Sequence, residues 1–326
     1  CKKMELLPIK SDIEILQSSP VSRDCFIEAN TVEMAFDEIE SKHIIPVWLK
    51  DNERLISHTD FIKATTDVFN TVYPNQQILS PAIRVSHPIK GRIPSARDKK
   101  ASELLEEEKT LFFERMMFCI EVPGICTNVG GNDLTLVVGG VKAYSEDNLY
   151  QRTGADQHFK LFAGFQNTVC TNLCVWTDGF SGNLRVRSLD ELYISIRSLL
   201  ERYQFGFHLQ HLDKLTETYI SESQFAQIIG RCRLYQHLPY SHKQEISPIL
   251  LGEQQLGAVV KAYYRDPFFQ RSEDRSISLW KLYNLLTGAN KSSYIDNFLE
   301  RSVNAYHFIE QIRYALEGRG DSWFLR

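Results

Sequence analysis

The amino-acid sequence predicts an α+β protein, with an antiparallel β-rich N-terminal half and an all-helical C-terminal half. Long apolar or alternating stretches between residues 111 and 187 are typical of strands. A segment rich in glycine and asparagine joins two of them, as in a hairpin. From residue 188 onward, the apolar period changes from about 2 to about 3.6 residues, which is the period of a helix. Strands followed by helices, rather than alternating with them, favour the α+β class.

The first hundred residues are expected to mix short helices and strands. The pattern Asn30-x-x-Glu33 resembles a capping box, which predicts a short helix extending to about residue 41. Pro74 is expected to end a later helix, because proline has no amide hydrogen to donate. The remaining elements expected here are strands over residues 44–48 and 55–58, a helix over 60–73 and a strand over 82–87.

The strands of the main sheet are expected next. The hairpin connection 128–133 contains Gly130 and Gly131, and we expect it to be longer than a two-residue turn. Glycines 179 and 182 are expected to form a turn that closes the sheet. The expected strands cover residues 111–122, 134–144, 158–165 and 168–176, with 184–187 as an edge strand.

A capping box, Ser188-x-x-Glu191, is expected to open the first helix of the second half. Further helices are expected over residues 208–219, 223–238, 252–265, 278–288 and 293–317, with Ser293 capping the last. We divide the chain into an α+β core domain, residues 1–205, and a helical domain, residues 206–326, that packs on the core. No flexible linker marks this boundary.

Composition excludes several classes of protein. Of the 326 residues, 43% are hydrophobic and 24% are charged, and no apolar run approaches the roughly 18 residues of a membrane helix. A net charge of −4 argues against a surface that is basic throughout, although it leaves room for a local basic groove. Seven scattered cysteines, an odd number, indicate reduced thiols and a cytoplasmic location.

The sequence contains few signs of catalytic or metal chemistry. Cys170, Cys174, His208 and His211 have the side chains of a zinc site. On a strand, however, residues four positions apart lie about 13 Å from each other, so we expect the two thiols to be buried packing groups. The glycine pairs match no phosphate-binding loop, and no nucleophile elbow is present. We therefore expect no catalytic residues, no metal and no cofactor.

Basic residues are concentrated in one stretch of the first half. These residues are Arg84, His87, Lys90, Arg92, Arg97, Lys99 and Lys100, and Arg185 and Arg187 follow on another expected strand. Cations that follow a phosphate backbone beside stacking aromatic rings would form a groove for a single strand. The alternative interpretation is a solvated loop that the acidic residues 103–108 balance, with the nearby phenylalanines in the core.

Two short motifs carry a family resemblance. They are Cys170-Thr-Asn172, at the end of the β-rich half, and Trp280-Lys-Leu-Tyr-Asn284, in the helical half. With them the chain resembles an uncharacterised phage- and plasmid-associated family, a domain of unknown function of bacterial mobile elements. The stretch Arg84-Val-Ser-His-Pro-Ile-Lys-Gly-Arg92 and residues 287–297 are similar to a branch from gut-bacterial mobile elements, and this likeness spans nearly the whole chain. Leu173 departs from the family, which usually has threonine there.

The resemblance implies no catalytic residue, because the family has none assigned. The order of helix, antiparallel strands and helix is also similar to that of single-strand annealing proteins. We therefore expect a cytoplasmic mobile-element protein that binds nucleic acid, single-stranded DNA in particular, without catalysis. One alternative is a protein–protein interaction module that acts on a host factor. Another is an enzyme with a polar pocket lined by His87, Cys170, Asn172 or His158. The sequence does not indicate an oligomeric state.

Overall fold

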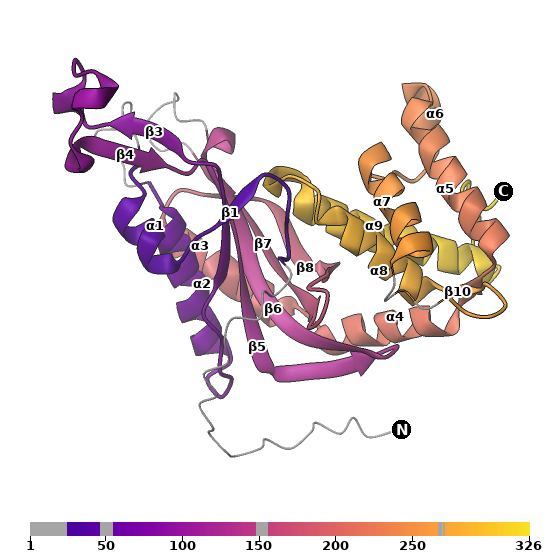
Figure 1. Cartoon of the computed structure of the whole chain (residues 1–326). Helices are drawn as coiled ribbons and strands as arrows, with labels where there is room; N and C mark the ends of the chain where they lie inside the picture. The colour runs from indigo at the N-terminus through magenta and orange to yellow at the C-terminus, as the bar shows by residue number, and fades with distance from the viewer. Residues whose placement is uncertain (1–24, 46–54, 148–155, 267–268, 270) are drawn as a thin grey trace.

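A six-stranded antiparallel sheet forms the centre of the computed structural model, which describes residues 25–45, 55–147, 156–266, 269 and 271–326 (Figure 1). Every neighbouring pair of strands is antiparallel. In spatial order the strands are β1 (Thr31–Glu33), β2 (Ala82–Ser86), β5 (Arg115–Val129), β6 (Asn132–Ala143), β7 (Gln157–Asn167) and β8 (Leu173–Val186). The sheet and the helices that follow it confirm the α+β class.

Helices cover both faces of this sheet. Helices α2 (His58–Val72) and α3 (Leu189–Arg202) lie on one face, where the ring of Phe61 meets that of Phe118 edge-on, with 5.0 Å between centroids. Helix α9 (Ile295–Leu316) packs on the other face through residues that include Phe298. Successive strand residues point to opposite faces, so Phe118 and its neighbour Met117 belong to different apolar clusters.

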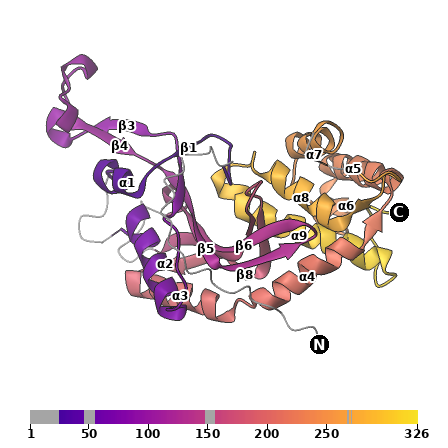
Figure 2. The same ribbon diagram turned by 60° about the horizontal axis from the view of Figure 1, so that its bottom comes forward.

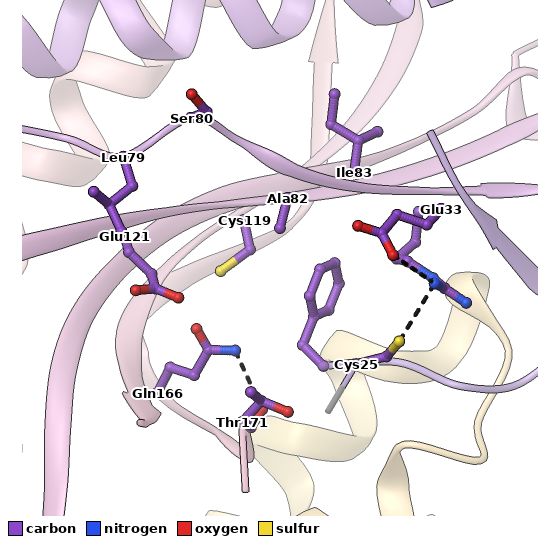
Figure 3. Close-up of a pocket in the computed structure, with 12 residues that line it drawn as sticks. Cys25, Glu33, Leu79, Ser80, Ala82, Ile83, Cys119, Glu121, Gln166 and Thr171 are labelled. Carbon is purple, nitrogen blue, oxygen red and sulfur yellow. Dashed lines mark hydrogen bonds and ion pairs between the residues drawn. The ribbon is translucent and has the colours of Figure 1, made fainter. Parts of the chain in front are cut away.

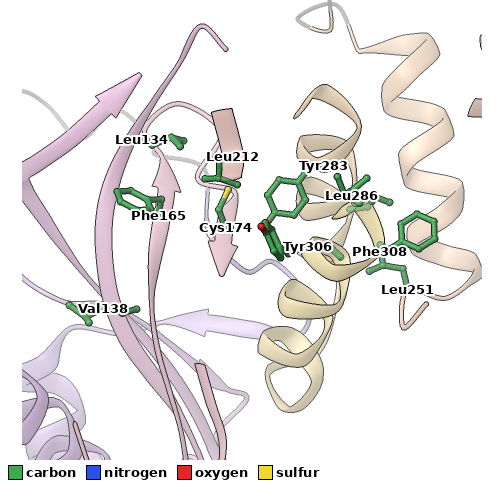
Figure 4. Packing of buried hydrophobic residues seen from close by; sticks show 14 of the residues in the cluster. Leu134, Val138, Phe165, Cys174, Leu212, Leu251, Tyr283, Leu286, Tyr306 and Phe308 are labelled. Carbon is green, nitrogen blue, oxygen red and sulfur yellow. The ribbon is translucent and has the colours of Figure 1, made fainter. Parts of the chain in front are cut away.

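The C-terminal half is largely helical, and the five helices expected after residue 205 are confirmed to within a few residues. They are α4 (Phe205–Glu217), α5 (Glu222–His237), α7 (Glu253–Arg265), α8 (Leu279–Asn290) and α9, with the short α6 (Tyr240–Lys243) and the strands β9 (Tyr219–Ile220) and β10 (Ile277–Ser278) between them. One apolar cluster contains Phe165 and Cys174 of the sheet together with Tyr283 and Tyr306 of these helices (Figure 4). The domain boundary at residue 205 stays a prediction.

A two-stranded ribbon projects from one end of the sheet (Figures 1 and 2). It consists of β3 (Ile89–Arg92) and β4 (Lys109–Phe112), which pair antiparallel between the end of β2 and the start of β5. Its tip and loops contain three single 3-10 turns, η1 (Pro94–Ala96), η2 (Ala101–Glu103) and η3 (Glu106–Glu108). Another such turn, η4 (Tyr144–Glu146), follows β6, and helix α1 (Phe36–Lys42) precedes the ribbon in sequence.

Two expectations near the N-terminus are wrong. Residues 31–33 form β1 instead of opening a helix, because Asn30 has a left-handed φ of 50° and Thr31–Glu33 pairs with β2. Residues 55–58 form no strand, because Ser57 caps α2. Its hydroxyl accepts a hydrogen bond from the amide of Asp60, and the Asp60 carboxylate accepts one from the amide of Ser57, both at 3.0 Å. The expected strand 44–48 lies partly outside the described residues.

Three expected turns and caps also differ from the structure. Val129 pairs with Asn132, so the hairpin turn is only Gly130 and Gly131, whose φ values of 55° and 85° fit a type I′ turn.

Glycines 179 and 182 lie within the continuous strand β8 and form no turn. A Cβ at Gly179 would lie 2.1 Å from the carbonyl oxygen of Ala163, so close approach of the neighbouring strand requires glycine there.

Tyr294, rather than Ser293, occupies the N-cap position of α9. Within the described residues, no helix is long and apolar enough to cross a membrane.

Candidate nucleic-acid interface

Arg84, the first of the predicted basic residues, is held inside the fold. It lies on β2, and its guanidinium donates hydrogen bonds to the hydroxyl and the carbonyl of Thr31 at 3.0 and 3.1 Å. The same group lies 3.4 Å from the sulfur of Cys25 and 3.8 Å from the carboxylate of Glu33. Arg84 therefore fastens β1 to β2, and only 12% of its side chain is exposed.

The other residues of the basic stretch lie on the ribbon and at its base. His87 and Lys90 are exposed near the base, and Arg97 and Lys100 are exposed towards the tip. Two further cations have partners within the ribbon. Arg92 donates to the carbonyl of Lys99, and the Lys99 ammonium pairs with Glu108.

Carboxylates balance much of the ribbon's positive charge. Residues 89–112 contain six lysines and arginines and five aspartates and glutamates, which leaves a formal charge of +1. Lys109 and Glu106 form another pair at 2.5 Å. The electrostatic field of the ribbon alone is therefore weak, and solvent screens its exposed pairs.

Arg185 and Arg187 lie at the end of β8. Both are exposed, and Arg185 pairs in register with His158 of β7. Arg187 directly follows the strand and binds Asp156 at 2.8 Å, although 67% of its side chain remains exposed. This hydrogen bond lowers the pKa of the Asp156 carboxyl.

The structure brings these two basic regions to the same end of the sheet. In an antiparallel sheet, the start of β5 lies at the same end as the end of β8, and the ribbon joins the sheet where β5 begins. Strands β5, β6 and β7 lie between β2, which His87 follows, and β8, so the two regions lie about 19 Å apart at roughly 4.8 Å per strand. Regions almost a hundred residues apart in sequence thus lie at the same end of the sheet.

A buried polar cluster supports the base of the ribbon. The ring nitrogen Nε2 of His58 lies 2.8 Å from the carbonyl oxygen of Phe113, and the amide of Phe113 donates to Nδ1 of His43 at 3.1 Å. The two imidazoles stack with 4.8 Å between centroids. Burial lowers the pKa of His43 to about 4 and that of His58 well below its usual range, so both are neutral at pH 7.

Sequence reasoning missed this cluster, because the contacting residues are 55 and 70 positions apart and no local motif marks them. Lys142 and Asp147 of the adjoining strand end form a buried ion pair at 2.5 Å. His158, which the enzyme alternative placed in a polar pocket, donates a hydrogen bond from its backbone amide to the carboxylate of Asp147 at 2.7 Å.

Cys170, Cys174, His208 and His211, the residues considered for zinc, form no group of metal ligands within the described part of the chain. Cys170 lies in the turn between β7 and β8, whereas Cys174 lies buried on β8. His208 is buried and shares a 2.7 Å hydrogen bond with the hydroxyl of Tyr203. Among the residues that the structure describes, no three His, Cys, Asp or Glu side chains are grouped as metal ligands. The six described cysteines are free thiols.

The motif residues of the family resemblance meet where the sheet joins the helical half. Asn172 donates from its side chain to the carbonyl of Asn284 at 3.0 Å, and the Asn284 side chain donates to the carbonyl of Trp280 at 3.0 Å. The Trp280 indole in turn donates to the side chain of Asn132 at 2.9 Å. The buried Lys291 donates to the carbonyl of Cys170. These contacts give the motif a structural role.

Comparison with known proteins identifies a family without an assigned function. The family model described as "Domain of unknown function, B. Theta Gene description (DUF3871)" matches residues 11–325. Searches of curated proteins and of solved structures gave no match. Because the family model covers almost the entire sequence, the chain belongs to the DUF3871 family.

Proposed function

We propose that the chain binds single-stranded nucleic acid across the end of the sheet from which the ribbon projects. The observation that carries this proposal is the convergence of two basic regions. His87 and Lys90 lie at the ribbon base, next to the end of β2, and Arg185 and Arg187 lie at the end of β8, with β5, β6 and β7 between them. Exposed cations in two groups about 19 Å apart could contact phosphates a few nucleotides apart along an extended strand.

The charge balance sets the expected strength of this binding. Carboxylates of the ribbon would oppose the approach of phosphate, so we expect affinity in the non-specific range, with a Kd of roughly 10⁻⁴ to 10⁻⁶ M. Contacts that release counterions would make the affinity fall as salt rises. From the resemblance of the Cys170–Asn172 and Trp280–Asn284 motifs to proteins of bacterial mobile elements, we further propose a cytoplasmic role in the biology of such elements, without catalysis.

The test is fluorescence anisotropy of a labelled single-stranded DNA at low and moderate salt. Lys90→Glu and Arg185→Glu, one from each basic region, are each expected to weaken binding and to reduce its salt dependence. Lys214→Glu is the matched control, because Lys214 is exposed on α4 in the helical half and the charge change is the same. Absence of binding at low salt, or equal losses in all three variants, would refute the proposal.

A second candidate function is the binding of a partner protein by the ribbon. Ile89 and Leu105 are 53% and 55% exposed, and Ile44 beside the ribbon is 47% exposed. A groove of about 670 Å³, lined by residues that include Ile89, Ile93 and Phe112, runs along this surface. Exposed apolar groups among balanced charges are typical of a surface that binds a protein.

The two candidates respond differently to apolar substitutions. Ile89→Asp and Leu105→Asp are expected to abolish capture of a host protein while changing DNA binding little beyond the effect of the added charge. If the same variants leave the set of co-purifying proteins unchanged, the ribbon is not a protein-binding surface.

A further inference from the structure

One edge of the projecting ribbon has no neighbouring strand among the residues that the structure describes. On the other edge, β4 has a neighbour, because the amide of Ile44 donates to the carbonyl of Leu111 at 2.8 Å. Strand β3 pairs with β4 alone. In Figures 1 and 2, β3 is also the strand of the ribbon that lies farther from helix α1. The backbone of β3 is therefore an open edge.

The register of the ribbon identifies the backbone groups on this edge. The amide of Ile93 donates to the carbonyl of Glu108, the residue opposite, at 2.9 Å. In an antiparallel pair, residues that bond to the partner strand alternate with residues whose N–H and C=O point away from it. Counting back from Ile93, Arg92 and Lys90 are the residues that point away. Each therefore presents one donor and one acceptor at the open edge.

The side chains of β3 divide into an apolar and a basic face. Ile89 and Ile93 lie on one face, because successive side chains of a strand alternate. They line the groove of about 670 Å³ together with Phe112, and Ile89 is 53% exposed. Lys90 and Arg92 lie on the opposite face. A strand added at this edge would meet apolar side chains on one face and cations on the other.

The basic face carries excess positive charge. The ion pairs of the ribbon use Lys99 and Lys109, and the Arg92 guanidinium donates to a carbonyl, which carries no charge. A second groove, of about 850 Å³, lies along this face. Its charged lining residues are four cations and two carboxylates, namely Lys42, Lys90, Arg92, Lys109, Glu106 and Glu107. The groove therefore favours a partner with negative charge.

The charges make a second copy of this edge a poor partner. Residues that point outward must pair with residues that point outward. Antiparallel self-pairing would therefore set Lys90 opposite Lys90, Arg92 opposite Arg92, or Lys90 opposite Arg92. Each of these registers places like charges directly opposite each other, which destabilises a sheet.

We infer that the open edge of β3 binds an extended peptide segment of a partner protein, in which acidic residues alternate with other residues and apolar residues flank them. Such a segment adds a strand through main-chain hydrogen bonds, and its side chains give specificity. Antiparallel pairing centred on Gly91 sets acidic residues opposite Lys90 and Arg92, and apolar residues opposite Ile89 and Ile93. The matching pattern is apolar, acidic, any residue, acidic, apolar. The inference rests on the second candidate function, protein binding by the ribbon, and names the chemistry of the partner.

Fluorescence anisotropy with the full chain and a labelled peptide, Ser-Ile-Glu-Thr-Glu-Ile-Ser, tests the inference. Saturable binding is expected, and a peptide with lysine in place of both glutamates should bind at least about tenfold more weakly. Methylation of the backbone nitrogen of either glutamate removes a hydrogen bond to Lys90 or Arg92, and should weaken binding by about tenfold. The same methylation at the central threonine is the matched control, because that N–H points away from β3.

A charge exchange adds a test on the protein. Lys90→Glu should weaken binding of the acidic peptide and strengthen binding of the lysine peptide. Arg185→Glu is the control, because it makes the same charge change at the same end of the sheet but outside the ribbon. It should leave peptide binding unchanged even if it weakens DNA binding. Thermal melting checks that both variants fold.

The inference fails if the acidic peptide does not bind saturably, if the lysine peptide binds as well, or if methylation at threonine costs as much as methylation at glutamate. These three results come from the wild-type protein, so they decide the question even if a variant does not fold. Loss of a co-purifying protein in Ile89→Asp, without peptide binding, would leave the ribbon a protein-binding surface and refute only the added strand.

Discussion

The side-chain amide of Asn172 donates a 3.0 Å hydrogen bond to the backbone carbonyl of Asn284, and so ties the last turn of the sheet to helix α8. The turn itself is tightly defined. Asn167 accepts hydrogen bonds from the amides of Val169 and Cys170, and Thr171 has a left-handed φ of 52°. Because Asn172 is 5% exposed, its bond to α8 is shielded from water and contributes to stability.

Asn172→Ala is expected to lower the free energy of unfolding by about 1–3 kcal/mol, since the substitution removes the buried donor to the Asn284 carbonyl. Urea denaturation measures the loss. Asn183→Ala on the exposed edge of β8 is the control and is expected to change stability by less than about 0.5 kcal/mol. Equal losses of stability in Asn172→Ala and Asn183→Ala would show that the hydrogen bond between Asn172 and Asn284 does not stabilise the fold.

Gly130 and Gly131 are expected to respond differently to alanine. Both have a positive φ, so alanine should cost about 1–2 kcal/mol at either position. A Cβ at Gly130 would also lie 2.5 Å from Cδ1 of Trp280, whereas a Cβ at Gly131 meets nothing within 4 Å. Gly130→Ala should therefore destabilise by clearly more than Gly131→Ala in urea denaturation. Similar losses would contradict the packing of the hairpin tip on α8.

The histidines beneath the ribbon should make stability depend on pH. The pKa of His43 is about 4 in the folded protein and about 6.5 when unfolded. Between these values the unfolded chain binds the extra proton, so stability is lost as pH falls from 6.5 towards 4. The loss attributable to His43 should be about 3 kcal/mol, because one pKa unit corresponds to about 1.4 kcal/mol.

His43→Asn tests this expectation, because an asparagine oxygen can replace Nδ1 as the acceptor for Phe113 without titrating. Its free energy of unfolding should fall less steeply between pH 6.5 and pH 4 than that of the wild type. His237→Asn, on an exposed histidine, is the control and should follow the wild-type curve. A steep fall that persists in His43→Asn would assign the acid sensitivity elsewhere.

The buried pair of Lys142 and Asp147 should show strong energetic coupling. Lys142→Met leaves the Asp147 carboxylate buried beside the amide of His158, and should cost about 3–5 kcal/mol. Adding Asp147→Asn removes the charge and keeps an acceptor for that amide, so the double variant should be more stable than Lys142→Met. A double-mutant cycle by urea denaturation measures the coupling. If the stability losses of the two single variants simply add up in the double variant, Lys142 and Asp147 are not energetically coupled.

Much of the secondary structure follows from local sequence. The helix after Ser188 and the five that follow it match their apolar periodicity, because an amphipathic helix must turn its apolar stripe towards a core. The expected strands 134–144 and 158–165 match β6 and β7, whereas the expected strands 168–176 and 184–187 are parts of one strand, β8, that begins only at Leu173. Local chemistry was misleading where two interpretations competed. Asn30-x-x-Glu33 has the letters of a capping box, yet pairing with β2 makes residues 31–33 a strand.

The sequence by itself determined the fold class, most elements and the family motifs, because these depend on periodicity and residue type within short windows. Only the tertiary structure decided which distant groups meet. It bonded Arg84 to Thr31 and placed Lys90 and Arg185 at one end of the sheet. It also brought Gln166 and Glu121, from two different strands, to the wall of one small pocket (Figure 3). Strand order and register fix such contacts, and they arise from packing across the whole sheet rather than from any local pattern.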